Sequence, residues 1–128
     1  MMEVSGQLIT TLLKNSCKIR LKTSGSSMIP HIFPNEIATI IPLSESLTAS
    51  GIYLYISDNQ LILHRLHKVS SLSSGVYTFK GDANNFLDPP VMERQIIGQL
   101  GTIRSTPTSI KNRIEYLCKK LFNEIYRI

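Results

Sequence analysis

The middle of this chain consists of short segments rich in β-branched and aromatic residues, and Gly, Asn, Ser or Pro separates each from the next. The segments are CKIRLKT, IATIIPL, GIYLYIS, QLILHRLHKV, GVYTFK and IIGQLGTI. Segments of this length, punctuated by turn residues, are typical of β-strands. We therefore expect a mostly β fold with an antiparallel sheet that is coiled or barrel-like.

Helical periodicity is confined to the two ends of the chain. Apolar residues recur at helical spacing over residues 3–15, which predicts a short amphipathic helix. A longer stripe predicts an amphipathic helix at the C-terminal end, with Thr108 or Ser109 as its cap. The stripe consists of Ile110, Ile114, Leu117, Leu121, Ile125 and Ile128. We expect a β domain over residues 1–103, followed by a basic helix within 104–128 that either packs on it or lies at its periphery.

Length and composition indicate one globular domain. The chain has 128 residues, of which 42% are hydrophobic and 18% charged, enough for one hydrophobic core. The net charge of +5 is a modest basic bias, and no basic stretch is interleaved with aromatic residues as in single-strand nucleic-acid binders. We do not expect nucleic acid as a partner.

The cysteines and the N-terminal segment bear on the cellular compartment in which the protein works. Cys17 and Cys118 lie far apart and form no metal-spaced pair, so we expect reduced thiols, no metal and no cofactor. The N-terminal segment lacks the positive region and the long apolar stretch of a signal peptide. No window reaches the roughly 18–20 apolar residues that span a bilayer. We expect a cytoplasmic protein.

The stretch SGSSMIP, residues 24–30, resembles a flexible linker at first sight. Linkers, however, are depleted in large apolar residues, and here Met28 and Ile29 follow the serines directly. The alternative is a loop that presents a hydroxyl group. A serine hydroxyl is a poor nucleophile unless a base takes its proton.

Three histidines are candidate bases, and His64 is the strongest. Strand alternation places it on one face with Ile62 and Leu66, the face more apt to point inward, whereas His31 directly follows SGSSMIP. A partly desolvated imidazole stays neutral near pH 7, as a general base requires. The competing interpretation is a histidine that is simply satisfied within the core.

The stretch FKGDANNFLDPP supplies two carboxylates, Asp82 and Asp88. Turns of this composition often serve backbone geometry alone, and Asp82 is placed to form an Asx turn. The functional alternative is that one of the two carboxylates accepts the second ring N–H of His64. The residues alone leave open which of the two it is.

Taken together, SGSSMIP, LILHRLHKV, GDANNFLDPP and IIGQL resemble, in this order, the superfamily that joins type I signal peptidases to self-cleaving phage and SOS repressors. The resemblance runs from about Ser24 to Gly98. It implies a mostly β, coiled fold and a serine endopeptidase without a cofactor. It also implies a nucleophile at the serine before Met, which is Ser27.

The resemblance is strongest to the endoplasmic-reticulum and archaeal type of signal peptidase, which has His-Arg where other members have a lysine base. His64 and Arg65 match that pair. That branch also has an acidic residue six positions after the Asp of Gly-Asp, and Asp88 lies six after Asp82. The resemblance therefore favours Asp88 as the residue that orients His64, with Asp82 as a structural or second carboxylate, although the roles are exchangeable.

Three positions depart from the pattern of signal peptidases. Gly25 stands where many of them carry an oxyanion-binding serine, so oxyanion stabilisation would come from backbone N–H groups near Gly25 and from that of Ser27. His31 stands where Thr often follows Pro. The N-terminal membrane anchor is missing, so the chain corresponds to a short form.

These features predict a serine endopeptidase that cuts an extended peptide or leader-bearing precursor after small residues. One alternative is a self-cleaving regulatory module, although the stretch before the serine loop is too short for a DNA-binding domain. Another is a catalytically silent peptide-binding domain of the same fold.

The C-terminal stripe has two interpretations. It is either an ordinary core-covering or dimer-forming helix, or a basic amphipathic helix through which residues 108–128 lie on an anionic membrane, peripheral at its inner face.

Overall fold

The structure, a computed structural model, describes residues 6–69 and 75–126, with side chains up to residue 122. Seven antiparallel strands form one sheet in the order β1-β2-β7-β3-β4-β5-β6. The strands are β1 (Ile19–Lys22), β2 (Ile37–Ile41), β3 (Ile52–Ser57), β4 (Gln60–Val69), β5 (Val76–Lys80), β6 (Val91–Met92) and β7 (Ile96–Arg104). Two α-helices, α1 (Gly6–Lys14) and α2 (Pro107–Tyr126), and the 3-10 turn η1 (Glu93–Gln95) complete the described chain.

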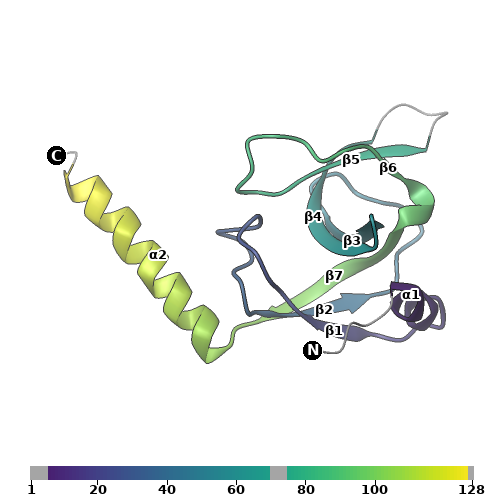
Figure 1. Ribbon diagram of the computed structural model, residues 1–128, viewed down its shortest axis with the longest axis horizontal. Coiled ribbons are helices and arrows are strands. Elements are labelled where there is room, and N and C mark those ends of the chain that lie inside the picture. Colours follow the sequence, from purple (N-terminus) through teal and green to yellow (C-terminus); the bar gives the residue numbers. More distant parts are fainter. Residues whose placement is uncertain (1–5, 70–74, 127–128) are drawn as a thin grey trace.

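The prediction of a mostly β chain with a helix near each end is confirmed. The sheet is strongly curved, with β3 and β4 wound above β7 (Figure 1). It is not a closed barrel, because the edge strands β1 and β6 are not paired with each other among the described residues. Residues 3–5 of the predicted first helix lie outside the described residues.

Two details differ from the sequence-based prediction. The two-residue strand β6 pairs with β5, and it is too short to leave a periodic pattern in the sequence. The cap of α2 was predicted at Thr108 or Ser109, but Pro107 is the first helical residue and Thr106 precedes it. Thr106 Oγ1 accepts a hydrogen bond from the Ser109 N–H at 3.2 Å, as an N-cap residue does.

Buried apolar side chains lie on both faces of the curved sheet. Ile9 and Leu13 of α1 pack against residues of β2, β3 and β7, which explains the amphipathic pattern of the first helix. On the other side, Tyr55, Leu66 and Phe79 belong to a second cluster formed by β3, β4 and β5. These strands are therefore fixed by packing on the side where the candidate site lies.

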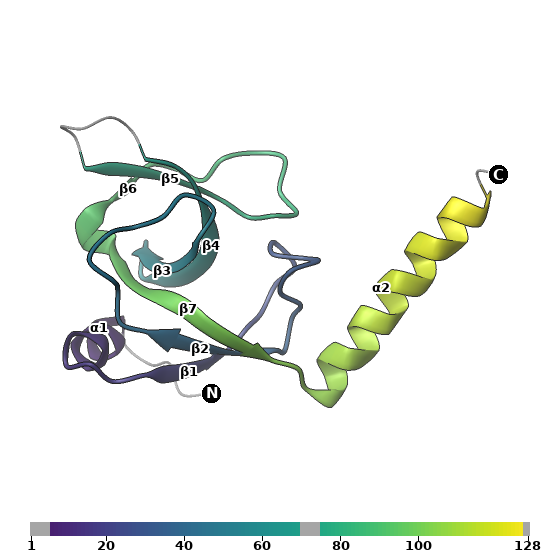
Figure 2. The ribbon, with the colours of Figure 1, turned by 180° about the vertical axis from the view of Figure 1, so that it is seen from behind.

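The helix α2 projects away from the sheet (Figure 2). Its first turns are attached through the Arg113 side chain, which binds Glu36, and through an edge-to-face contact between Tyr116 and Phe33, whose ring centroids lie 5.5 Å apart. Over the described residues, no helix combines the length and apolar character needed to cross a bilayer.

Candidate active site

The serine loop, residues 24–34, is a firmly anchored loop between β1 and β2. Met28 and Ile32 are 5% and 3% exposed and pack against Ile52 of β3. At its base the Thr23 hydroxyl donates to the Phe33 carbonyl at 2.9 Å. The loop therefore buries Met28, one of the two apolar residues that distinguished it from a linker, and the backbone that carries Ser27 is held in place.

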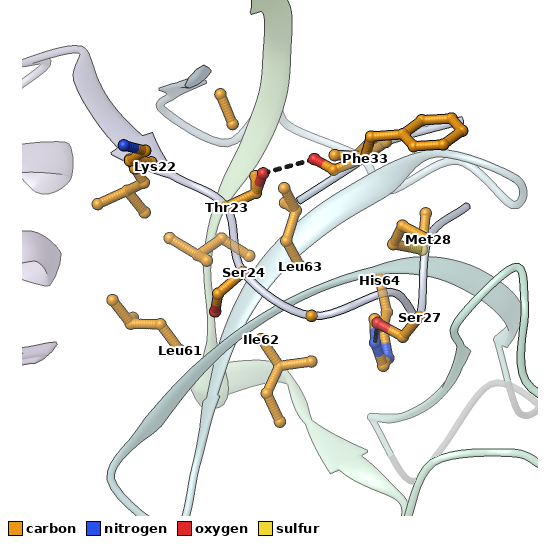
Figure 3. A pocket seen from close by; sticks show the side chains of 15 residues that line it. Lys22, Thr23, Ser24, Ser27, Met28, Phe33, Leu61, Ile62, Leu63 and His64 are labelled. Carbon is orange, nitrogen blue, oxygen red and sulfur yellow. Dashed lines mark hydrogen bonds between the residues drawn. The ribbon is translucent and has the colours of Figure 1, made fainter. Parts of the chain in front are cut away.

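Ser27 and His64 are joined by a hydrogen bond. The Ser27 Oγ lies 2.9 Å from His64 Nε2, and Figure 3 shows the Ser27 hydroxyl next to the His64 ring. His64 points to the same side of β4 as the buried Leu66, and its side chain is 12% exposed. The alternation of the strand thus brings the imidazole to the serine from a position 37 residues away.

Asp88 holds the other ring nitrogen. Its Oδ2 lies 2.5 Å from His64 Nδ1, and its side chain is 7% exposed. The Asp88 N–H donates to the carbonyl of Phe79 at 2.8 Å. This hydrogen bond brings the turn that follows β5 back to the end of that strand. The carboxylate is therefore positioned by the backbone of a core strand.

A buried phenol also binds Asp88. The Tyr55 hydroxyl donates to Asp88 Oδ2 at 2.5 Å, and the tyrosine is 2% exposed. Burial, together with the hydrogen bond to the carboxylate and its charge, raises the pKa of Tyr55, so this phenol remains a donor. Tyr55 and His64 both donate to one carboxylate oxygen when the Nδ1 proton is present.

Asp82 has a different partner. Its two carboxylate oxygens accept from Arg65 Nε and Nη2, both at 2.8 Å, and Arg65 also donates to the Ser50 carbonyl at 2.7 Å. The hydrogen bond from Arg65 is the main reason why the pKa of Asp82 is lowered. Of the two predicted carboxylates, the structure brings Asp88 to the imidazole and pairs Asp82 with the neighbouring arginine.

The Gly81-Asp82 stretch also contacts the nucleophile loop directly. The Ala83 N–H donates to the Ser27 carbonyl at 2.8 Å. A Cβ atom on Gly81 would lie 2.8 Å from that carbonyl oxygen and 3.0 Å from the Ser27 Cβ. Only glycine permits the end of β5 to approach the serine this closely.

We predict that Gly81→Ala displaces Ser27 from His64, because the clash involves backbone atoms that cannot rotate away. The expected result is at least a roughly tenfold slower reaction of Ser27 and about 1–3 kcal/mol lower stability, the usual cost of overpacking. Acylation kinetics and thermal unfolding measure the two effects. An unchanged acylation rate would contradict the close approach.

The predicted oxyanion residues lie beside the serine. Gly25 has a φ of +76°, the left-handed region that favours glycine, and it lines a cavity next to Ser27. No acceptor binds the Ser27 N–H within the described part of the chain. This N–H is thus open to a substrate oxygen, whereas the role of Gly25 stays a prediction.

The other two histidines lie apart from this cluster. His31 and His67 are exposed, and neither is hydrogen-bonded to Ser27 in the described ranges. The His31 carbonyl accepts from Arg113 at 3.1 Å. The residues described contain no group of three or more His, Cys, Asp or Glu side chains arranged to hold a metal ion, and Cys17 and Cys118 are free thiols.

A cavity of about 440 Å³ opens beside Ser27 and His64. Its walls are the end of β1 and the serine loop on one side and Leu61–His64 of β4 on the other (Figure 3). Strand β5 pairs with β4 only from Arg65 onward, so that edge of residues 60–64 has no strand partner within the described residues. The cavity therefore lies beside a free strand edge.

Sequence reasoning missed Tyr55 and the cluster around Glu36. The β-branched and aromatic residues of GIYLYIS predicted a strand, but nothing in them indicates that one tyrosine reaches a carboxylate 33 residues later. Arg65 was noted only as part of the His-Arg pair, without its partner Asp82. The contacts of Tyr55 and Arg65 depend on how β3, β4 and the turn after β5 are placed in space, and those of Glu36 on where α2 folds back.

The chain matches no family model, and no curated protein matches its sequence.

Proposed function

We propose that this chain is a serine endopeptidase of the signal peptidase and repressor type, in its Ser-His form. The observation that carries the proposal is the hydrogen-bonded series Ser27 Oγ, His64 Nε2, His64 Nδ1 and Asp88 Oδ2. These contacts have the geometry of a nucleophile, its general base and the group that orients the base. The curved, open sheet also agrees with the coiled β fold that the family resemblance implies.

In the proposed reaction, Ser27 Oγ attacks a peptide carbonyl carbon while His64 Nε2 takes the hydroxyl proton. Asp88 holds Nδ1–H and stabilises the imidazolium, and the Ser27 N–H binds the developing oxyanion. His64 then returns the proton to the leaving amine as the C–N bond breaks. A water molecule hydrolyses the acyl-enzyme by the same route, which releases the carboxylic acid and restores Ser27.

The cavity supports an extended peptide as the substrate. A free strand edge at residues 60–64 offers main-chain hydrogen bonds to an added strand, the common way of holding unfolded segments. The family resemblance adds small side chains at the first and third positions before the cut. A leader-bearing precursor is a substrate of this kind.

Labelling with a fluorophosphonate tests the proposal without a known substrate. We expect covalent modification at Ser27, located by peptide mass spectrometry. Labelling is expected to be lost in Ser27→Ala and in His64→Ala, and retained in Ser26→Ala, which removes the exposed neighbouring hydroxyl. A folded wild-type chain that does not react would favour the alternative of a silent peptide-binding domain.

Self-cleavage is the second alternative, and the intact mass of the chain distinguishes it. After long incubation at mildly alkaline pH, a self-cleaving module yields two fragments in wild type and none in Ser27→Ala. A processing enzyme stays intact and cuts an added peptide in trans.

A further inference from the structure

The apolar stripe of α2 lies on the surface. Its four described members, Ile110, Ile114, Leu117 and Leu121, are 49%, 55%, 55% and 58% exposed. They do not cover the core, which the sheet and α1 close without them. We call these four residues the apolar face of α2.

Basic residues flank this apolar face on both sides. At about 100° per residue, Lys111 and Lys120 each lie about 90° from its centre, on opposite sides, and Lys119 lies nearly opposite it. All three lysines are exposed. Lysines in flanking positions can extend their charged ends towards water while the apolar face lies against a nonpolar layer.

The attachment of the helix leaves the apolar face unobstructed. Ser109, Arg113 and Tyr116 hold the first turns to the β body, and they are centred about 100° from the middle of the apolar face. From this attachment the helix projects past the sheet (Figure 1). The apolar face is therefore not the face by which the helix is attached to the body.

We propose that the apolar face of α2 docks on an anionic lipid surface. Exposed apolar residues bordered by lysines, in a chain of net charge +5, are complementary to acyl chains bordered by anionic headgroups. A second copy of this chain, paired through its own α2, is a poorer partner for the apolar face. Pairing two such helices would bring Lys111 and Lys120 to the edges of the contact, where like charges repel.

Co-sedimentation of the full chain with vesicles tests this proposal. We expect binding to phosphatidylcholine vesicles that contain phosphatidylglycerol, little binding to phosphatidylcholine alone, and weaker binding as salt is raised. Each lysine near an anionic surface contributes about fivefold in affinity, so Lys111→Gln with Lys120→Gln is expected to weaken binding by about 25-fold.

The apolar contribution needs a matched pair of variants. Leu117→Glu places a charge in the centre of the apolar face and is expected to weaken binding at least tenfold. Thr108→Glu adds the same charge to the same helix about 150° away and is expected to change binding by less than about threefold. Circular dichroism of both variants reports whether α2 is retained.

Three results would overturn the proposal. One is equal binding to neutral and anionic vesicles, or none to either. Another is Leu117→Glu binding as tightly as wild type with the helix intact. The third is a wild-type dimer, without vesicles, that Leu117→Glu converts to a monomer, since this would assign the apolar face to a second copy. Because the readout is binding, it is independent of whether Ser27 reacts.

Discussion

Replacing Asp88 by Asn is expected to slow acylation of Ser27 by about 10³–10⁴-fold while the chain stays folded. Because Tyr55 and His64 Nδ1 both contact Oδ2, the amide atom that takes this place faces both of them. With the amide oxygen there, the group accepts from Nδ1–H but carries no charge to stabilise the imidazolium. With the NH₂ group there, Nδ1 must accept, so the proton moves to Nε2 and the imidazole cannot take the serine proton.

Asp82→Asn is the matched control, because it makes the same chemical change in the same turn. It weakens the charge-assisted pair with Arg65, whose side chain is 31% exposed, so we expect a loss of about 1 kcal/mol in stability. Acylation should slow by less than about tenfold. Rate constants with a fluorophosphonate, measured together with melting temperatures, separate the two variants. Equal slowing by both would contradict the assignment of Asp88 to His64.

Replacing Arg113 by Met is expected to lower the free energy of unfolding by about 3 kcal/mol, the lower end of the range for breaking a buried ion pair. Glu36 is 0% exposed, and Arg113 reaches it with Nη2 at 2.7 Å and Nε at 3.1 Å. The arginine is itself 33% exposed, which limits the cost. Lys111→Met, two residues earlier on the same helix, is expected to change stability by less than about 0.5 kcal/mol.

The difference in unfolding free energy between wild type and Arg113→Met is expected to depend on pH, with a definite sign. Burial raises the pKa of Glu36, but hydrogen bonds from Arg113, the Phe33 N–H and Ser105, with the arginine charge, outweigh it and leave the pKa lowered. In wild type this ionised carboxylate stabilises the fold above the unfolded-state pKa, and the contribution is lost as pH falls through the lower folded-state pKa.

Without the arginine, burial dominates and the neutral form of Glu36 is favoured. The stability of Arg113→Met should therefore approach that of wild type as pH falls from 7 towards 4. Urea unfolding at several pH values measures this convergence. A difference that is constant with pH would mean that Arg113 acts through packing on Phe33, which its guanidinium covers at 4.5 Å, and not through Glu36.

The sequence predicted the strands well because each carries β-branched or aromatic residues between turn residues. The strand alternation that placed His64 beside Ile62 and Leu66 also placed its imidazole at the serine loop. The residues alone could not decide which of Asp82 and Asp88 orients His64, since both follow the same strand and the choice depends on where the turn folds back. The family resemblance favoured Asp88. The helix α2 was ambiguous for a similar reason. An apolar stripe has the same pattern whether or not something covers it. The position of the helix is set by the contacts of Arg113 with Glu36 and of Tyr116 with Phe33.

Glu36 also connects α2 to the serine loop. Its oxygens join the Phe33 N–H, on the return limb of the serine loop, to a side chain in the second turn of the helix. A chain cut between β7 and α2 would leave this carboxylate without its counter-ion, nine positions after the nucleophile in the sequence. Such a chain is expected to lose at least the stability that Arg113→Met loses, and an uncharged residue at position 36 is expected to lessen the loss.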